Sequence, residues 1–162
     1  MAINKKINCF IFTVGRSDFG ILKHIVLSLD KSKFFNSKLI ITGAHFSKIF
    51  GDTINEIKRE KIKNKIFLNV KYSKNKDSEI DVFASLSIKS EKLFQKIRPD
   101  FVIILGDRYE AFSLALSAFR NHIPIVHLCG GSDTLGSKDD IYRYLISKIS
   151  SLHLVATRYH MK

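Results

Sequence analysis

The stretch RPDFVIILGDR, residues 98–108, decides the fold class of this chain. Pro99 ends the segment before it, because the residue that precedes a proline is disfavoured in the helical conformation. The five apolar residues 101–105 then predict a strand that is buried on both faces, and Gly106 opens the loop that follows. Strands of this kind are typical of parallel sheets whose two faces are both covered by helices.

The same arrangement recurs along the whole chain. Short apolar runs bounded by turn residues predict six strands, at residues 7–14, 37–42, 65–70, 101–106, 123–128 and 152–157. Amphipathic stretches between them predict five helices, at residues 19–29, 51–60, 78–97, 108–120 and 139–150. Strands that alternate with helices indicate an α/β protein with a Rossmann-like, doubly wound parallel sheet. We expect one domain over residues 1–162, with the polar segment 71–79 as a mobile loop.

The composition is that of a basic globular protein. The chain of 162 residues is 45% hydrophobic and 26% charged, which is ordinary for a soluble domain. Its net charge of +12 also suits nucleic acid or an acidic membrane surface, and binding to nucleic acid would depend steeply on salt. The lysines are scattered singly, without an arginine-rich face or an aromatic platform. This pattern favours a solvated lysine-rich surface, and we expect neither a nucleic-acid partner nor a membrane partner.

The two cysteines and the N-terminal run bear on the location of the protein. Cys9 and Cys129 lie far apart, with no CxxC or Cys/His spacing, which argues for a reducing compartment and against a structural zinc site. Residues 4–15, NKKINCFIFTVG, resemble a signal peptide, but the apolar run is too short to cross a membrane and no small-residue cleavage site follows Val14. We therefore expect a buried first strand, a cytoplasmic protein and no metal.

In a doubly wound sheet, ligands bind in the crevice beyond the carboxyl ends of the strands, so the residues that follow strands are the candidates. After the first strand, TVGRSDFG (13–20) lacks the lysine and hydroxyl residue of a Walker A motif, and no GxGxxG motif is present. Arg16 lies in this turn, with Ser17 or Asp18 as the expected N-cap of the first helix. A guanidinium group beside free helix N–H groups predicts an anion site that suits a diphosphate. The alternative is a surface arginine beside an ordinary capped turn.

Two further loops carry ionisable residues. After the second strand, His45 falls in a loop, where a single histidine either touches a ligand or is incidental. After the fourth strand, Asp107, Arg108 and Glu110 fall at a strand-to-helix turn. Carboxylates there either cap the helix or serve as acid/base groups and as acceptors for sugar hydroxyls. Because this turn faces the anion site across the crevice, it favours a charged, hydroxylated ligand.

The fifth strand leads into the loop HLCGGSDTLGSKDDIYRY, residues 127–144. His127 and Cys129 end the strand, and Gly130 and Gly131 allow the backbone to approach a ligand closely. Cys129 is either a nucleophile with His127 as its base or a buried, inert cysteine.

The same loop ends in a predicted helix. Asp139 and Asp140 begin this helix, and Arg143 follows one turn later on it. The two aspartates either cap the helix or take part in the site.

Five segments taken together resemble the N-terminal half of the UDP-N-acetylglucosamine 2-epimerases, specifically the UDP-hydrolysing branch of sialic-acid-type sugar synthesis. They are TVGRSDFG (13–20), ITGAHFSKIFGDTINEI (41–57), RPDFVIILGDRYEAFSLALSAF (98–119), IPIVHLCGG (123–131) and DDIYRYLISKISSLHLVAT (139–157). The resemblance runs in the family's order over essentially all of the chain. It implies one half of a glycosyltransferase-B-like fold, with the active site in the cleft between two Rossmann-like domains.

The resemblance also implies a reaction. UDP leaves UDP-N-acetylglucosamine by elimination across C1 and C2, and water then adds with inversion at C2, which gives N-acetylmannosamine and UDP. This chemistry needs a base near C2, a group that stabilises the departing diphosphate and an acid/base group for hydration, but no redox cofactor. By position, the implied catalytic residues are His45, Asp107, Glu110 and Asp140. The implied substrate-binding residues are Arg16, Asp18, Arg108, His127, Cys129, Gly130, Gly131 and Arg143.

Three positions depart from the family pattern. The family usually has His or Glu at Cys129, Glu at Ser132 and His at Tyr144. These exchanges remove proton carriers from one loop, although cysteine can still transfer protons and tyrosine can donate a hydrogen bond. Two alternatives therefore stay open: a related epimerase for a different UDP-amino sugar, and a catalytically silent sugar-nucleotide-binding or assembly module.

A fourth departure concerns residues 156–162, ATRYHMK, where family members continue into a C-terminal nucleotide-binding domain. One half of a cleft enzyme forms one wall of the site and cannot exclude water. We expect this chain alone to be inactive or nearly so, as a truncated reading frame, as a fragment or as one subunit of a split enzyme. Its expected partners are a UDP-sugar, the missing domain or a separate subunit that supplies it, and a second copy bound through helices 78–97 or 108–120.

Overall fold

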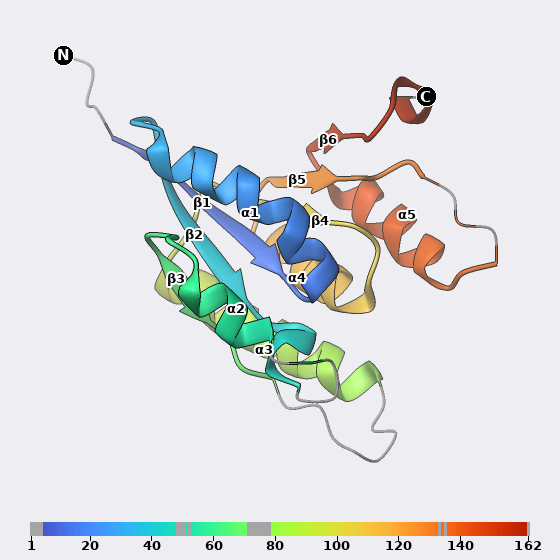
Figure 1. Cartoon of the computed structure of the whole chain (residues 1–162). Coiled ribbons are helices and arrows are strands. Elements are labelled where there is room, and N and C mark those ends of the chain that lie inside the picture. Colours follow the sequence, from blue (N-terminus) through green and yellow to red (C-terminus); the bar gives the residue numbers. More distant parts are fainter. Residues whose placement is uncertain are drawn as a thin grey trace.

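The computed structural model has one six-stranded sheet with helices on both faces (Figure 1). It describes residues 5–47, 51, 53–70, 79–132, 134 and 136–161. The strands are β1 (Ile7–Thr13), β2 (Phe35–Ile41), β3 (Lys65–Phe67), β4 (Phe101–Leu105), β5 (Ile125–Leu128) and β6 (Leu152–Leu154). They lie in the order β3-β2-β1-β4-β5-β6, and every neighbouring pair is parallel. The predicted doubly wound parallel sheet is confirmed.

Helices form most of the connections between these strands. The described helices are α1 (Arg16–Lys31), α2 (Thr53–Arg59), α3 (Glu79–Lys96), α4 (Tyr109–Arg120) and α5 (Asp139–Ile149), with short 3-10 helices η1 (Gly43–Phe46) and η3 (Arg158–Met161). No helix in the described ranges is long and apolar enough to cross a membrane.

Alternate residues of the central strand build two separate cores. Cys9 and Ile11 of β1 pack in a cluster with α1 and α2, whereas Phe10 and Phe12 pack in a cluster with α3, α4 and α5. This division follows from the two-residue period of a strand, which sends successive side chains to opposite faces. Helices α1 and α2 therefore cover one face of the sheet and the other three helices cover the opposite face (Figure 1).

Several element boundaries differ from those predicted. Helix α1 begins at Arg16 rather than at residue 19, so this arginine belongs to the first turn of the helix. The outer strands β3 and β6 end earlier than predicted, and each pairs over only three residues with its single neighbour. An edge strand has a partner on one side only, so fewer hydrogen bonds hold its ends. Residues 71–78, which make up all but the last residue of the predicted mobile loop and include the predicted first residue of the third helix, lie outside the described residues. Glu79, also predicted to lie in that loop, is the first residue of α3.

The crevice predicted by this topology opens between β1 and β4. These strands are neighbours in the sheet, yet β1 connects through α1 to β2 on one side and β4 connects through α4 to β5 on the other. The loops at their carboxyl ends therefore diverge, and this switch point is where doubly wound sheets bind ligands. The segments 14–16 and 106–108 border it.

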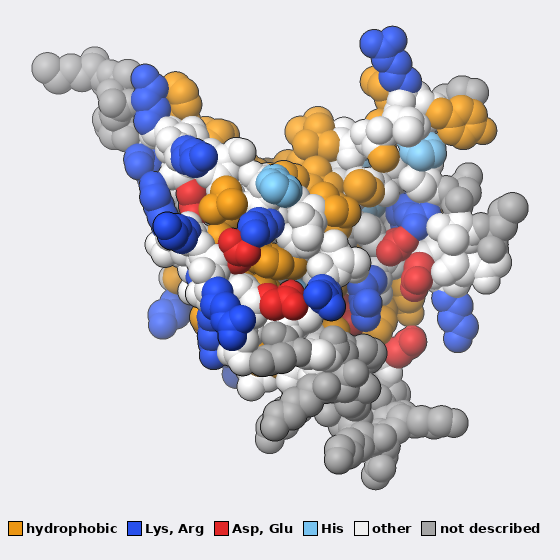
Figure 2. All heavy atoms as spheres, in the orientation of Figure 1, with side chains coloured by type: hydrophobic (Ala, Val, Ile, Leu, Met, Phe, Trp, Pro, Cys, Tyr) orange, Lys and Arg blue, Asp and Glu red, His pale blue; other side chains and the backbone are white. Residues whose placement is uncertain are grey.

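The surface over α1 and α2 carries mixed charge. Figure 2 shows Lys and Arg side chains scattered over this face with Asp and Glu between them. Lys23 pairs with Glu60, and Arg16 pairs with Glu56 at 3.2 Å. This arrangement matches the solvated, lysine-rich surface expected from the sequence.

Candidate active site

The first loop is closed by a buried carboxylate. Asp18 Oδ2 accepts hydrogen bonds from the backbone N–H groups of Val14 and Gly15, each at 3.1 Å, and Asp18 Oδ1 accepts one from Ser17 Oγ. The N-cap of α1 is Gly15, so the expectation that Ser17 or Asp18 would be the N-cap is wrong. Asp18 is instead the third helical residue and its side chain reaches back to the cap, as in a capping box. Burial raises the pKa of Asp18, against the opposing effect of these hydrogen bonds and of Arg108.

Arg108 connects the fourth-strand loop to the first-strand loop. Its Nε and Nη2 donate to the two carboxylate oxygens of Glu110 at 3.1 and 2.9 Å, and the Glu110 side chain is fully buried. Such a bidentate pair fixes the plane of the guanidinium group. The Nη1 atom reaches Gly15, where a Cβ would lie only 3.7 Å from it. Glu110 therefore orients Arg108 across the crevice.

A pocket of about 250 Å³ lies between these loops. Its lining residues come from four segments of the chain: Gly15, Arg16, Ser17, Ala44, Thr53 and Arg108. Two guanidinium groups beside the start of a 16-residue helix make this pocket electropositive, which suits an anionic ligand. Arg16 is exposed and bound to Glu56, so a ligand there would compete with that carboxylate.

His45 lies behind this pocket and is almost fully buried. Its Nε2 bonds to Thr13 Oγ1 and its Nδ1 to Thr53 Oγ1, both at 2.9 Å, and its ring packs edge-on against Phe19. Burial, with a smaller contribution from Arg108, lowers the pKa of His45 to about 4. The imidazole is therefore neutral at pH 7 and joins the end of β1 to the start of α2.

Arg143 joins three segments at the other end of the crevice. Its side chain is 9% exposed, and its Nη2 pairs with Asp107 Oδ2 while its Nη1 donates to Asp140 Oδ1 at 2.6 Å. Nη1 also donates to the carbonyl oxygen of Ser132, and Nη2 donates to Thr134 Oγ1 at 3.3 Å. One guanidinium group thus brings together the β4 loop, the β5 loop and α5.

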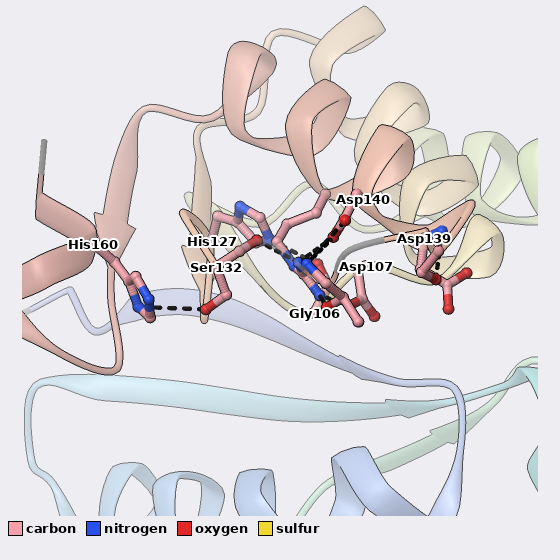
Figure 3. Close-up of polar contacts among 10 residues, drawn as sticks. Gly106, Asp107, His127, Ser132, Asp139, Asp140 and His160 are labelled. Atoms are coloured by element: carbon pink, nitrogen blue, oxygen red, sulfur yellow. Dashed lines mark hydrogen bonds and ion pairs between the residues drawn. The ribbon is translucent and has the colours of Figure 1, made fainter.

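The two acids at the start of α5 behave differently. Both carboxylate oxygens of Asp140 accept the backbone N–H of Thr134, at 2.9 Å, in addition to the bond from Arg143. We call Arg143 with Asp107 and Asp140 the arginine cluster, and the side chain of Asp139 points away from these two aspartates (Figure 3). The helix N-cap is Lys138, so neither aspartate occupies the cap position.

His127 lies inside the sheet rather than on the crevice wall. It is a residue of β5 with no exposed surface, its Nε2 bonds to the Gly106 carbonyl at 2.8 Å, and its Nδ1 bonds to Ser147 Oγ at 3.1 Å. Burial lowers the pKa of His127. Both ring nitrogens are engaged, so His127 is not available as a base for Cys129.

The residues after β5 have an unusual backbone. Cys129 has φ of 61°, which is rare for a residue with a side chain, and its N–H donates to the Leu154 carbonyl at 2.9 Å. Gly131 has φ of 79°, and a Cβ there would lie 2.8 Å from the carbonyl oxygen of His160. A Cβ on Gly130 would lie 2.8 Å from His127 Nδ1. The two glycines are thus required by packing against the protein itself.

The structure gathers the predicted residues into two groups. The first contains Arg16, Asp18, His45, Arg108 and Glu110 around the electropositive pocket, and the second contains Asp107, Asp140 and Arg143. His127, Cys129, Gly130 and Gly131 lie beside the second group.

Sequence reasoning missed several hydrogen-bonding groups in these loops: Thr13, Thr53, Thr134, Ser147, His160 and the carbonyl of Ser132. They lie up to 32 residues from the groups they bind, so no local pattern marks them. In the part of the chain that the structure describes, no group of three or more His, Cys, Asp or Glu residues could hold a metal ion.

Arginines and carboxylates thus gather at the switch point of a Rossmann-like sheet, the place where doubly wound domains bind their ligands. A family model described as UDP-N-acetylglucosamine 2-epimerase matches residues 27–162, and the chain belongs to this family.

Individual relatives support the assignment to this family. The chain is 38% identical over 156 residues to a GDP/UDP-N,N'-diacetylbacillosamine 2-epimerase (hydrolyzing) of Campylobacter jejuni, covering 94% of this chain and 40% of that protein. It is 32% identical to a UDP-N,N'-diacetylbacillosamine 2-epimerase (hydrolyzing) of Legionella pneumophila, covering 91% and 39%. The fold matches the crystal structure of UDP-GlcNAc 2-epimerase from Neisseria meningitidis bound to UDP-GlcNAc with a TM-score of 0.81 at 22% identity, covering 95% and 42%. The chain therefore spans about 40% of the length of these relatives.

Proposed function

We propose that this chain is the N-terminal domain of a hydrolysing 2-epimerase that acts on a UDP-amino sugar. The reaction proposed is the conversion of UDP-N-acetylglucosamine to N-acetylmannosamine and UDP. The observation that carries the proposal is the pair of carboxylates, Asp107 and Asp140, held by one guanidinium group beside the switch point of the sheet. Two nearby acids and an electropositive pocket match the needs of proton transfer at C2 and departure of a diphosphate.

The proposed roles follow from where the side chains lie. Asp107 and Asp140 are the proposed acid/base groups, since both carry carboxylates that are partly exposed. Arg16 and Arg108 are the proposed contacts of the diphosphate, because both line the pocket at the start of α1. A guanidinium group there would stabilise the negative charge that develops on the leaving group.

Glu110 and His45 are proposed to serve the same reaction as positioning groups. Glu110 is fully buried and bonded to Arg108 through both oxygens, and His45 is buried with both nitrogens bonded to threonine hydroxyls. Neither side chain has an open face toward the pocket in this arrangement, so each would act through the groups it holds.

A second candidate substrate is UDP-N,N'-diacetylbacillosamine. Two relatives carry this sugar in their names, and one of them is 38% identical to this chain. The departures from the family pattern at Cys129, Ser132 and Tyr144 fit a change of amino sugar. A catalytically silent binding or assembly module is the remaining alternative, and it predicts UDP-sugar binding without turnover.

The proposal includes partners. Because one wall of a cleft cannot exclude water, we propose that a second, nucleotide-binding domain completes the site, whether on the same polypeptide or on another. We also propose a homodimer through the outer face of α3 and α4, where Ile88, Leu116 and Phe119 are exposed. A cytoplasmic location is proposed as well, supported by the free thiols of Cys9 and Cys129.

Turnover in deuterated water tests the proposed reaction. The chain is mixed with each UDP-sugar, alone and together with the C-terminal domain of a family member, and UDP and the released sugar are followed by NMR. We expect almost no turnover by the chain alone, and UDP release with deuterium at C2 of the sugar when the second domain is present. Asp107→Asn and Asp140→Asn should each lower the rate by at least about 100-fold, the size typical of a lost acid/base group.

The outcomes separate the alternatives. UDP release from only one of the two sugars identifies the substrate. Binding of a UDP-sugar without UDP release, even with the second domain present, contradicts the epimerase proposal and leaves the silent module.

A further inference from the structure

We propose that Ser132 is a positioning residue that couples the C-terminal segment 157–161 to the arginine cluster of the site. The hydroxyl of Ser132 lies 3.3 Å from His160 Nδ1, and the carbonyl of the same residue accepts a hydrogen bond from Arg143 (Figure 3). The inference rests on the proposed function only for the role of Asp107 and Asp140 as acid/base groups. The coupling of Ser132 to Arg143 is a property of the chain itself.

The C-terminal segment is fitted closely to the loop. Thr157 Oγ1 also lies 3.4 Å from His160 Nδ1, and the N–H of His160 donates to the Thr157 carbonyl at 3.1 Å. The carbonyl oxygen of His160 approaches Gly131 so closely that a Cβ there would lie 2.8 Å away. Gly131 therefore allows the segment to pack against the backbone, and Ser132 joins it by a side-chain bond. We call these contacts of Gly131, Ser132 and His160 the latch.

The latch acts on the carboxylates through Arg143. The Ser132 carbonyl shares Arg143 Nη1 with Asp140, while Nη2 of the same guanidinium group holds Asp107. A guanidinium group is planar, so a shift of one acceptor changes the direction in which it meets the others. Movement of the segment 157–161 would displace Ser132 and alter the relative positions of the two acids. Ser132 would thus act through Arg143 rather than on the substrate.

NMR of the full chain tests the latch without any substrate. Ser132→Ala removes the hydroxyl but keeps the carbonyl, and His160→Ala removes the ring from the other side. In both variants we expect the Arg143 side-chain N–H signal to shift and the amides of Gly131, Ser132 and Thr134 to exchange about fivefold faster, as for one lost hydrogen bond. Ser151→Ala, an exposed serine outside the loop, is the matched control and should change neither readout.

Rescue distinguishes the latch from a merely structural role. His160→Asn places an amide near the position of Nδ1 and should restore the wild-type Arg143 signal, whereas His160→Ala should not. The double variant Ser132→Ala/His160→Ala should shift this signal no further than either single change. An Arg143 signal that is unchanged in both single variants overturns the proposal, as does an additive double variant.

Turnover adds a separate readout. With the second domain present, Ser132→Ala should lower kcat about fivefold and leave KM unchanged, because Ser132 would move the acids and not the diphosphate contacts. If the wild-type chain releases no UDP under any condition, the proposed function fails and the NMR result still decides the latch. If UDP release is normal and the NMR signals do not respond, only the latch fails.

Discussion

Three ionisable side chains of the predicted site are buried in the structure, those of His45, His127 and Glu110. The sequence marked them as candidates because polar residues that follow or end strands gather at one edge of a parallel sheet. It could not predict their partners, because Thr13 and Thr53 meet His45 only after β1, η1 and α2 have packed. The sequence could place Arg16 beside the crevice because this residue closely follows the first strand. A buried hydrogen bond could not be predicted in this way, because its two partners can lie far apart along the chain.

Acid should destabilise the protein through His45. Its pKa is about 4 in the folded chain and about 6.5 when unfolded, so the unfolded state binds more protons below pH 6.5. The contribution of His45 to the free energy of unfolding is therefore fully present above about pH 6.5, and it is lost as the pH drops toward 4. We expect His45 to account for a loss of about 2 kcal/mol between pH 7 and pH 5, measured by urea unfolding.

His45→Gln isolates this contribution. The difference in unfolding free energy between pH 7 and pH 5 should be about 2 kcal/mol smaller in the variant than in the wild type. His24→Gln, on the exposed side of α1, should leave the difference unchanged. Equal pH dependence of His45→Gln and the wild type would show that the imidazole is not held neutral by burial.

Among the elements, the order of strands and helices was predictable and the ends of several were not. The spacing and the runs of apolar residues identified six strands and five helices, because apolar residues lie on the buried face of each helix and on both buried faces of the inner strands. The start of α1 was placed three residues late, because Asp18 caps it from inside the first turn and leaves no N-cap residue of the usual type. The edge strands β3 and β6 are shorter than predicted, because each pairs with one neighbouring strand over only three residues. The length of this pairing cannot be read from the sequence.

Close packing of β5 against α5 depends on Gly130. A Cβ at this position would lie 2.8 Å from His127 Nδ1 and 3.0 Å from Ser147 Oγ. Gly130→Ala should therefore destabilise the protein by about 1–3 kcal/mol in urea unfolding, the range for overpacking.

Gly20→Ala is the matched control for this substitution. Gly20 lies within α1, and nothing lies within 4 Å of a Cβ there. This change should stabilise the protein by about 0.5–1 kcal/mol, because alanine is the better helix former. A neutral result for Gly130→Ala would contradict the packing described for β5 and α5.

The chain spans about 40% of the length of the relatives that it matches. Its helices α3 and α4 carry exposed apolar side chains on their outer face. Two hollows of about 320 and 240 Å³ lie on this side, the first of them lined by an aromatic cluster in which Phe83 and Phe112 are 5.8 Å apart. The sequence predicted amphipathic helices here, but the exposed residues became evident only when the sheet-facing side of each helix was known.

The proposed homodimer is tested by sedimentation equilibrium. We expect the wild-type chain to associate to twice the monomer mass, and Phe119→Glu to remain monomeric, because a buried charge in an apolar interface is unfavourable. Phe34→Glu is the control, since Phe34 is also exposed but immediately precedes β2 and belongs to neither α3 nor α4. A wild-type chain that is monomeric at every concentration, or a Phe119→Glu dimer, would count against this interface.

The pairing of β1 with β4 also has a consequence for how the chain folds. Cys9 pairs with Phe101, and the Asn8 N–H bonds to Asp100 across 92 residues. Closing so long a segment costs more conformational entropy than forming the nearby pairing of β1 with β2, and long-range pairings slow folding. The crevice does not exist until β4 has docked. A ligand bound there would stabilise only states in which this late step is complete, so it would slow unfolding without speeding the earlier steps of folding.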